Sequence, residues 1–245
     1  MTDASCIDLT QFKRWYSQSG TPLVTVTDHF DAELKRYQLT FKQKNLPTAD
    51  QESKQTLHIP VDIELLNSQG KAFDLGAGLT NKVLSLTHTE QTFVFENLNE
   101  KPVPCLFRSF SAPVKYQYAY SDENLLHLIS FASDEFSRWD AGQTLFNKYL
   151  LSNVQDKQSG KAFSLHSLFI EAFRSALTSE TLDSALIADM FEFISENGAM
   201  ELFDKVDIEI LHQAREFILN TLASHLHSEF LAIYHKHQQP GVYQP

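Results

Sequence analysis

The stretch that decides the fold of the first half of the chain is Lys54–Leu65, which reads KQTLHIPVDIEL. Its apolar side chains occupy every second position, at Leu57, Ile59, Val61, Ile63 and Leu65. This spacing is that of a β-strand with one buried face. Pro60 falls on the opposite face, which favours an edge strand or a bulge because proline has no N–H for a ladder bond. A turn sequence, NSQG, follows at Asn67–Gly70.

Similar short runs lie on both sides of this strand and are separated by turn signals. The further strand candidates are Leu23–Phe30, Glu33–Gln43, Asn81–Thr87, Gln91–Glu96, Pro102–Arg108 and Pro113–Tyr120. About seven short strands without a helical period among them are typical of an antiparallel sandwich of immunoglobulin or fibronectin type. We expect this β domain to cover residues 22–120.

The period of the apolar residues changes at Ser121 to that of helices. Ser121 and Ser133 each precede acidic residues, which is a signal for the start of a helix. Further amphipathic helices are predicted at Leu165–Leu177, Leu182–Ile194 and Ile208–Lys236. No regular repeat length is visible, so the sequence predicts an array of helical hairpins over residues 121–245 and supports no regular solenoid. The predicted fold class is therefore α+β with two domains.

Charge is distributed unevenly between these halves. Residues 1–120 carry 12 Lys and Arg against 13 Asp and Glu, whereas residues 121–245 carry 8 against 18. An acidic helical half would repel a phosphate backbone, so nucleic acid is not an expected partner. No apolar run is long enough to span a bilayer, and MTDASCIDLT has no basic start. Together with two cysteines, Cys6 and Cys105, that suggest no disulfide framework, these features predict a cytoplasmic protein without a membrane partner.

The first 21 residues predict a helical stub before the sandwich. Asp8–Ser17 is a short helical candidate whose aromatic face, made by Phe12, Trp15 and Tyr16, is too large to be left in water. We expect this face to contact a further part of a longer polypeptide, and expect weak self-association when that part is missing. Trp139, in the run DEFSRWDA, is interpreted as a structural residue at the junction of the two domains, so that Trp139→Ala costs about 3 to 5 kcal/mol.

Motifs of catalysis and metal binding are incomplete in this sequence. None of the ten histidines begins an HExxH motif, in which two histidines bind zinc and the glutamate activates water. His225 and Glu229 have i, i+4 spacing, but two ligands without a third indicate an ordinary surface pair. Neither a nucleophile elbow nor a phosphate-binding glycine loop occurs. Gly198–Glu201 (GAME) is followed by Leu202 and is interpreted as a coincidental match to a substrate-amine motif, GxMEN.

Several runs together resemble the bacterial aminopeptidase N family of zinc metallopeptidases. They are FKRWYSQSGTP (12–22), KQTLHIPVDIEL (54–65), QTFVFENL (91–98), FSAPVKYQY (110–118), DEFSRWDAGQTL (134–145) and ELFD (201–204), in the same order as in the family. The resemblance implies the end of the catalytic domain in 1–21, the immunoglobulin-like domain in 22–120 and the first part of the C-terminal helical domain in 121–245. It implies zinc and peptide substrates for the parent protein, but no catalytic or metal-binding residue in this segment.

Two readings of function follow. In the first, the chain is an inactive scaffold and active-site cap within a zinc aminopeptidase that removes N-terminal amino acids from peptides, and its partner is the rest of that polypeptide. In the second, it is a free-standing β-sandwich and helical module that binds a protein through Phe12, Trp15 and Tyr16. The surrounding reading frame separates them, because only the first requires HExxH upstream of Met1. A third reading, a complete enzyme with an unrecognised site, has no motif in its favour.

Overall fold

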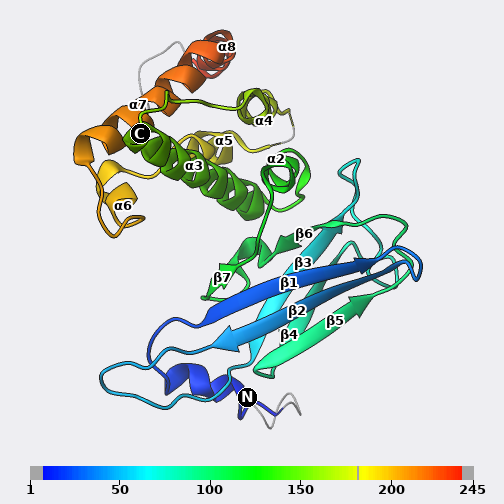
Figure 1. Cartoon of the computed structure of the whole chain (residues 1–245). Helices are drawn as coiled ribbons and strands as arrows, with labels where there is room; N and C mark the ends of the chain where they lie inside the picture. Colours follow the sequence, from blue (N-terminus) through cyan, green and yellow to red (C-terminus); the bar gives the residue numbers. More distant parts are fainter. Residues whose placement is uncertain (1–7, 181, 239–245) are drawn as a thin grey trace. The chain divides into compact units, whose positions relative to one another are not determined.

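The computed structural model describes residues 8–180 and 182–238, which form two compact units (Figure 1). The first unit contains the chain up to Ser121 together with Phe131–Ser137. The second contains Asp122–Ser130 and the chain from Arg138 onward. The predicted class is confirmed: an Ig-like β domain is followed by an all-helical domain. Cys6 lies outside the described residues.

Among the residues described in the first unit, seven strands form two facing sheets, as the sequence predicted. One sheet has the order β5-β2-β1-β7 and the other has the order β4-β3-β6. The strands are β1 (Leu23–Asp31), β2 (Arg36–Lys44), β3 (Ile59–Leu66), β4 (Asn81–Leu86), β5 (Glu90–Phe95), β6 (Val103–Leu106) and β7 (Lys115–Gln117). One pairing differs from the expected antiparallel sandwich, because β7 pairs with β1 in parallel.

The decisive stretch supplies the centre of the sandwich core. Leu57, Ile59, Val61, Ile63 and Leu65 are all buried, with at most 2% of their surface exposed. On the facing sheet, alternate residues of β1 and β2 are buried against them: Val24, Val26, Tyr37, Leu39 and Phe41. The period-2 pattern therefore identified the buried face correctly.

The expectation that Pro60 marks an edge strand is wrong, because β3 is the central strand of its sheet. The pairing with β6 begins only at Ile63, so Pro60 has a strand neighbour on one side alone, where it lies opposite Ser85. On the other side, the Ser111 hydroxyl donates to the Pro60 carbonyl and accepts from the Asp62 N–H. Proline is tolerated because its missing donor lies on the side that β6 does not reach.

Seven helices are described in the second half of the chain. They are α2 (Asp122–Phe131), α3 (Glu135–Gln158), α4 (Ser167–Leu177), α5 (Ser184–Met190), α6 (Glu196–Met200), α7 (Ile208–His225) and α8 (His227–His237). Asp183, Ser195 and Asp207 cap the starts of α5, α6 and α7 by accepting backbone N–H bonds. The core of this unit contains a cluster of aromatic side chains, in which Phe146 stacks on Phe193 with ring centroids 4.2 Å apart.

Two predicted helices are each broken in the structure. The expected helix Leu182–Ile194 ends at Met190, because Phe191 and Phe193 both contact the ring of Phe173. Residues two apart point in different directions on a helix, so only a non-helical backbone places both rings on the same core side chain. The expected long helix Ile208–Lys236 is divided at the fully buried Leu226 into α7 and α8.

The break at Leu226 is stabilised by a side chain from another helix. Arg174 of α4 donates to the backbone carbonyl of His225 over 2.9 Å and pairs with Glu229 at 2.7 Å. A carbonyl released by a helix end requires such a partner. Because Arg174 is 51 positions from His225 in the sequence, no local pattern could have predicted this end.

The predicted N-terminal helix is short. It consists of a 3₁₀ turn, η1 (Phe12–Tyr16), and it belongs to the β unit, near the label N in Figure 1.

Candidate functional site

The three aromatic side chains of the amino-terminal stub (residues 1–21, described from Asp8) do not form one continuous exposed face. Trp15 is partly buried and packs against the core of the sandwich. Phe12 and Tyr16 stay accessible, with 38% and 83% of their surface exposed, and contact each other edge to face at 6.1 Å between ring centroids. The stub thus covers one aromatic ring within its own unit and leaves two at the surface.

Side chains of the stub bind the backbone just before β3. The indole N–H of Trp15 donates to the carbonyl of His58 at 2.9 Å, and Arg14 donates to the carbonyl of Thr56 at 2.6 Å. Gln18 donates to the Gln55 carbonyl and accepts from the Gln55 N–H, at 2.9 and 2.6 Å. These are side-chain bonds to backbone groups rather than to opposing charges, so η1 is placed by shape and hydrogen bonding.

A second polar site in the β unit surrounds Asp134, in the middle of the segment Phe131–Ser137. Asp134 Oδ2 accepts from the backbone N–H groups of Ser109 and Ser137, both at 2.9 Å, and from the Ser137 hydroxyl at 2.6 Å. The Ser109 hydroxyl donates to Oδ1 at 2.5 Å. Burial raises the pKa of Asp134, but the hydrogen bonds from Ser109 and Ser137 outweigh it and hold the pKa below its ordinary value. The carboxylate caps α3 and at the same time binds the η2 turn (Arg108–Phe110).

Arg108, the residue before Ser109, lies close to two further carboxylates on β3. Its guanidinium lies 3.2 Å from Asp62 and 4.0 Å from Glu64, and it also donates to the Ser133 hydroxyl at 2.9 Å. Glu64 is almost fully buried, with 2% of its side chain exposed, and accepts from the backbone N–H of Ser133 at 3.1 Å. We call Asp62, Glu64, Arg108, Ser109 and Asp134 the carboxylate clamp, because they fasten Phe131–Ser137 to the sandwich.

Backbone conformation beside Arg108 shows how specific this arrangement is. Phe107, Ser109 and Phe110 have φ values of 55°, 51° and 52°, in the left-handed region that non-glycine residues seldom adopt. Such conformations persist only where surrounding contacts determine them. Here the Ser109 bonds to Asp134 and the Phe110 contact with Phe136, 5.7 Å between ring centroids, are those contacts.

Cys105 lies within the same unit as the clamp and is fully buried. Burial raises the pKa of its thiol to about 12, although a hydrogen bond with Ser137 opposes the shift. A thiol that is protonated at neutral pH and inaccessible is unsuited to nucleophilic catalysis.

The remaining sequence candidates lie in the helical unit. Trp139 lies in α3 and is partly buried. Glu229 pairs with Arg174, and His225 bonds to the Thr221 carbonyl at 2.8 Å through Nδ1. Both side chains of the i, i+4 pair His225 and Glu229 therefore have partners other than a metal ion. Within residues 8–180 and 182–238, no group of three His, Cys, Asp or Glu side chains could hold a metal ion.

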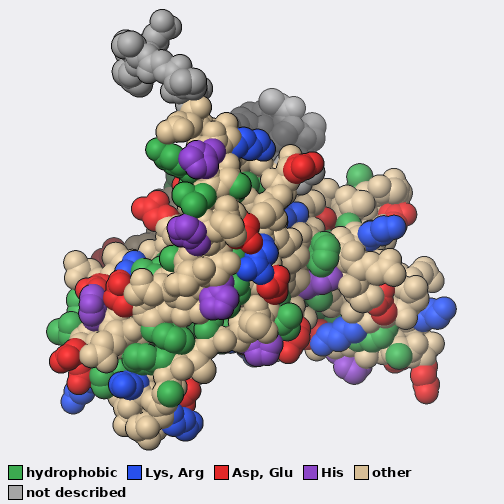
Figure 2. All heavy atoms as spheres, turned by 90° about the horizontal axis from the view of Figure 1, so that it is seen from above, with side chains coloured by type: hydrophobic (Ala, Val, Ile, Leu, Met, Phe, Trp, Pro, Cys, Tyr) green, Lys and Arg blue, Asp and Glu red, His purple; other side chains and the backbone are tan. Residues whose placement is uncertain are grey.

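The surface carries scattered charges in the view given by Figure 2. Lys and Arg side chains stand apart from one another on this face and are interspersed with acidic and neutral groups. Among the described helices, none is both long enough and apolar enough to cross a bilayer.

Sequence reasoning missed the clamp. Asp62 and Glu64 occupy positions that the period-2 pattern of β3 assigns to the solvent face, and Arg108 follows β6 in the η2 turn. Nothing in the sequence marks Arg108 and Glu64 as partners of Ser133, which is 25 and 69 positions away. The one available signal was Asp134, which was predicted to lie at a helix start and does cap α3.

Comparisons with known proteins agree with both units. Residues 20–119 match DUF3458, described as a domain of unknown function with an Ig-like fold. Residues 122–245 match DUF3458_C, described as ARM repeats. This description corrects the expectation that no regular solenoid is present, since ARM repeats stack into a helical solenoid. The described helices range from 5 to 24 residues, so no fixed repeat length is visible in the sequence.

Individual relatives extend over almost the whole chain. Aminopeptidase N of Escherichia coli (strain K12) is 46% identical over 241 residues, which are 98% of this chain and 28% of that protein. Aminopeptidase N of Haemophilus influenzae is 37% identical over 96% of this chain and 27% of that protein. A crystal structure of Legionella pneumophila aminopeptidase A in complex with aspartic acid superposes with a TM-score of 0.81 at 29% identity, over 99% of this chain and 27% of that one. The chain thus spans little more than a quarter of each.

Proposed function

Because this chain belongs to the DUF3458_C family, with a DUF3458 Ig-like domain before it, and is homologous to aminopeptidase N, we propose that it is the non-catalytic scaffold and active-site cap of a zinc aminopeptidase. Its parent removes N-terminal amino acids from peptides. The observation that carries the proposal is the match of both units, in order, to a continuous part of aminopeptidase N. In this proposal the β domain spaces the helical domain, and the helical domain restricts access of long peptides to the catalytic centre.

Zinc belongs to the parent and not to this segment. The residues present do not fit a zinc ion, because HExxH is absent from the sequence and no three-ligand group occurs among the described residues. We therefore assign no catalytic residue here. The purified chain should hold no stoichiometric zinc by elemental analysis and should not hydrolyse an aminoacyl chromogenic substrate. One tightly held zinc ion per chain would contradict this assignment.

The proposed partner of the stub is the rest of the parent polypeptide, in the cytoplasm. Phe12 and Tyr16 are the rings of the stub with the largest exposed surface, and they are the proposed contact with the catalytic domain. Trp15 orients them by fixing η1 on the sandwich. Trp139 remains the proposed structural residue at the domain junction.

A chimera tests the role of scaffold and cap. This chain replaces the matching region of E. coli aminopeptidase N, and in a second chimera the helical part 138–245 is deleted. The first should cleave a dipeptide and discriminate against a long peptide; the second, if it retains zinc and activity on the dipeptide, should lose that discrimination. Equal discrimination in both active chimeras would remove the capping role while leaving the scaffold role intact.

The alternative is a free-standing interaction module. The single observation in its favour is that the side chains of Phe12 and Tyr16 are exposed. The reading frame around the segment separates the two proposals. HExxH upstream in the same frame supports the peptidase parent, whereas a start codon at Met1 and a stop codon after Pro245 support the module.

A further inference from the structure

A pocket opens on the side of the sandwich where the outer strands of the two sheets face each other. Strands β5 and β4 each end their sheet at this side, and the space between them has a volume of about 500 Å³. This lies within the range of small-molecule sites. Its apolar lining is supplied by Phe73, Leu75, Phe95 and Leu98.

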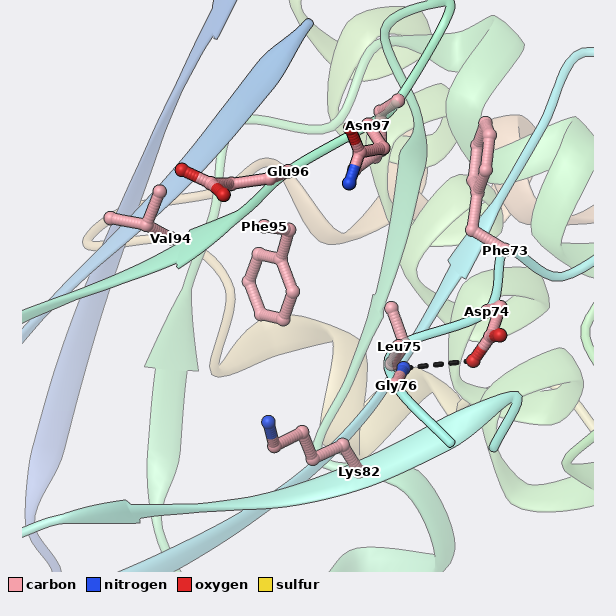
Figure 3. A pocket seen from close by; sticks show the side chains of 10 residues that line it. Phe73, Asp74, Leu75, Gly76, Lys82, Val94, Phe95, Glu96 and Asn97 are labelled. Carbon is pink, nitrogen blue, oxygen red and sulfur yellow. Dashed lines mark hydrogen bonds between the residues drawn. The ribbon is translucent and has the colours of Figure 1, made fainter. Parts of the chain in front are cut away.

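Polar groups of both signs stand around this apolar lining (Figure 3). Lys82 on β4 and Asp74 in the preceding loop lie on opposite sides of Leu75 in Figure 3, and the neutral side chain of Asn97 also lines the pocket. Glu96 is neutralised by Arg36 at 3.1 Å. Within the part of the chain that the structure describes, Lys82 has no carboxylate within ion-pair distance.

The loop that holds Asp74 is organised by one of its two carboxylate oxygens. Oδ1 accepts from the N–H groups of Gly76 and Gly78 at 2.8 and 3.0 Å. Both glycines have positive φ, 116° and 78°, so the loop requires residues without a Cβ there. The charge of Asp74 is thus fixed in place at the pocket by the backbone of its own loop.

From this arrangement we propose that the pocket binds a short peptide with free ends and apolar side chains, such as an apolar dipeptide. Its carboxylate pairs with Lys82, its ammonium pairs with Asp74, and its side chains cover Leu75 and Phe95. A ligand with one charge alone leaves a rim carboxylate or ammonium unpaired, while a zwitterion satisfies both. This inference does not depend on the proposed peptidase parent.

The test is an NMR titration of the ¹⁵N-labelled 245-residue chain with the dipeptide Leu-Leu. Amide shifts should concentrate at Gly76, Gly78 and Val94–Leu98, with a dissociation constant on the order of 1 mM, as expected for a small ligand on an open site. Lys82→Gln should weaken binding at least about fivefold. The matched control is Lys44→Gln, at the opposite end of β2 from the pocket, which should leave binding unchanged.

Two capped ligands and one variant test the two charges of the ligand separately, including the pairing of its ammonium with Asp74. N-acetyl-Leu-Leu lacks the ammonium and Leu-Leu-amide lacks the carboxylate; each should bind at least about fivefold more weakly than Leu-Leu. Asp74→Asn keeps an oxygen that accepts from Gly76 and Gly78, so the spectrum of this variant should show that the loop is still folded. Its affinity for Leu-Leu should fall, because the ammonium loses its partner. Its affinity for N-acetyl-Leu-Leu, which has no ammonium, should not change. Equal binding of all three ligands, or shifts that are unaffected by Lys82→Gln, would overturn the proposal.

Discussion

Two segments outside the strands are fastened to the same sandwich by different chemistry. The stub is held by neutral and singly charged donors that bind backbone carbonyls, and its Trp15 is partly buried. The carboxylate clamp instead encloses charges, with Glu64 2% exposed and Arg108 12% exposed at their side chains. Backbone acceptors do not titrate, and losing one donor leaves a carbonyl that water can reach. Losing one member of a buried charge set leaves the others without compensation, so the clamp should be the more sensitive of the two.

The largest expected effect is at Arg108. Arg108→Ala leaves Glu64 and Asp62 without their cation, and breaking a buried ion pair in this way costs about 3 to 5 kcal/mol. Urea unfolding measures this loss. In a Cys6→Ser background, the native-state reaction of Cys105 with a thiol reagent should also accelerate, because its burial depends on the same unit.

Arg36→Ala is the matched control, because Arg36 pairs with Glu96 on the same unit but at the surface, with 40% and 62% of the side chains exposed. Exposed pairs contribute about 1 kcal/mol or less. If the two arginine variants lose equal stability, the clamp is not a desolvated charge set.

A smaller effect is expected at Trp15. Trp15→Ala removes a partly buried ring and one hydrogen bond, for which we expect about 2 kcal/mol, below the range for fully buried aromatic residues. Trp15→Phe keeps most of the apolar contact and should cost about 1 kcal/mol. Tyr16→Ala, at an exposed neighbouring ring, should leave the melting curve unchanged; a loss as large as that of Trp15→Ala would show that η1 is held differently.

The pH dependence of the unfolding free energy also distinguishes the contacts of the carboxylate clamp from those of the stub. Because the pKa of Asp134 is lowered in the folded state, its stabilising contribution is present above the ordinary value of 3.8 and is lost as the pH falls through the folded value. The difference in unfolding free energy between the wild type and Asp134→Asn should therefore shrink below pH 3.8. The corresponding difference for Trp15→Phe should stay constant with pH, since neither an indole N–H nor a carbonyl titrates there. If the difference for Asp134→Asn also stayed constant with pH, the hydrogen bonds from Ser109 and Ser137 to the ionised Asp134 would be contradicted.

Self-association through the stub is the smallest expected effect. Phe12 and Tyr16 stay exposed while Trp15 is covered, so weak contact between copies should depend on the first two rings. Sedimentation at high concentration should show it for the full chain and not for a chain starting at Thr21. The double variant Phe12→Ser, Tyr16→Ser should abolish it without detaching η1. Monomers in every case would show that these rings do not drive association in the isolated chain.

The sequence by itself determined the parts of this protein whose cause is local. Alternation in Lys54–Leu65 identified the buried face of the central strand, and the serine and aspartate start signals placed α2 and α3. These succeed because period and capping are properties of neighbouring residues. The order of the runs that resemble aminopeptidase N also indicated the relationship, and the family matches to residues 20–119 and 122–245 agree with it.

Tertiary structure alone decided what depends on residues far apart in the chain. Pro60 is tolerated in the central strand of its sheet because the pairing with β6 reaches only to Ile63. The break between α7 and α8 at Leu226 depends on Arg174. Glu64 lies on the face of β3 opposite to Ile63 and Leu65, which the alternation leaves to solvent, yet its side chain is buried and accepts from Ser133 of the segment Phe131–Ser137. A sequence pattern reports which face of a strand a residue occupies; it does not report which distant segment returns to cover that face, and that covering segment sets the cost of burying each charge.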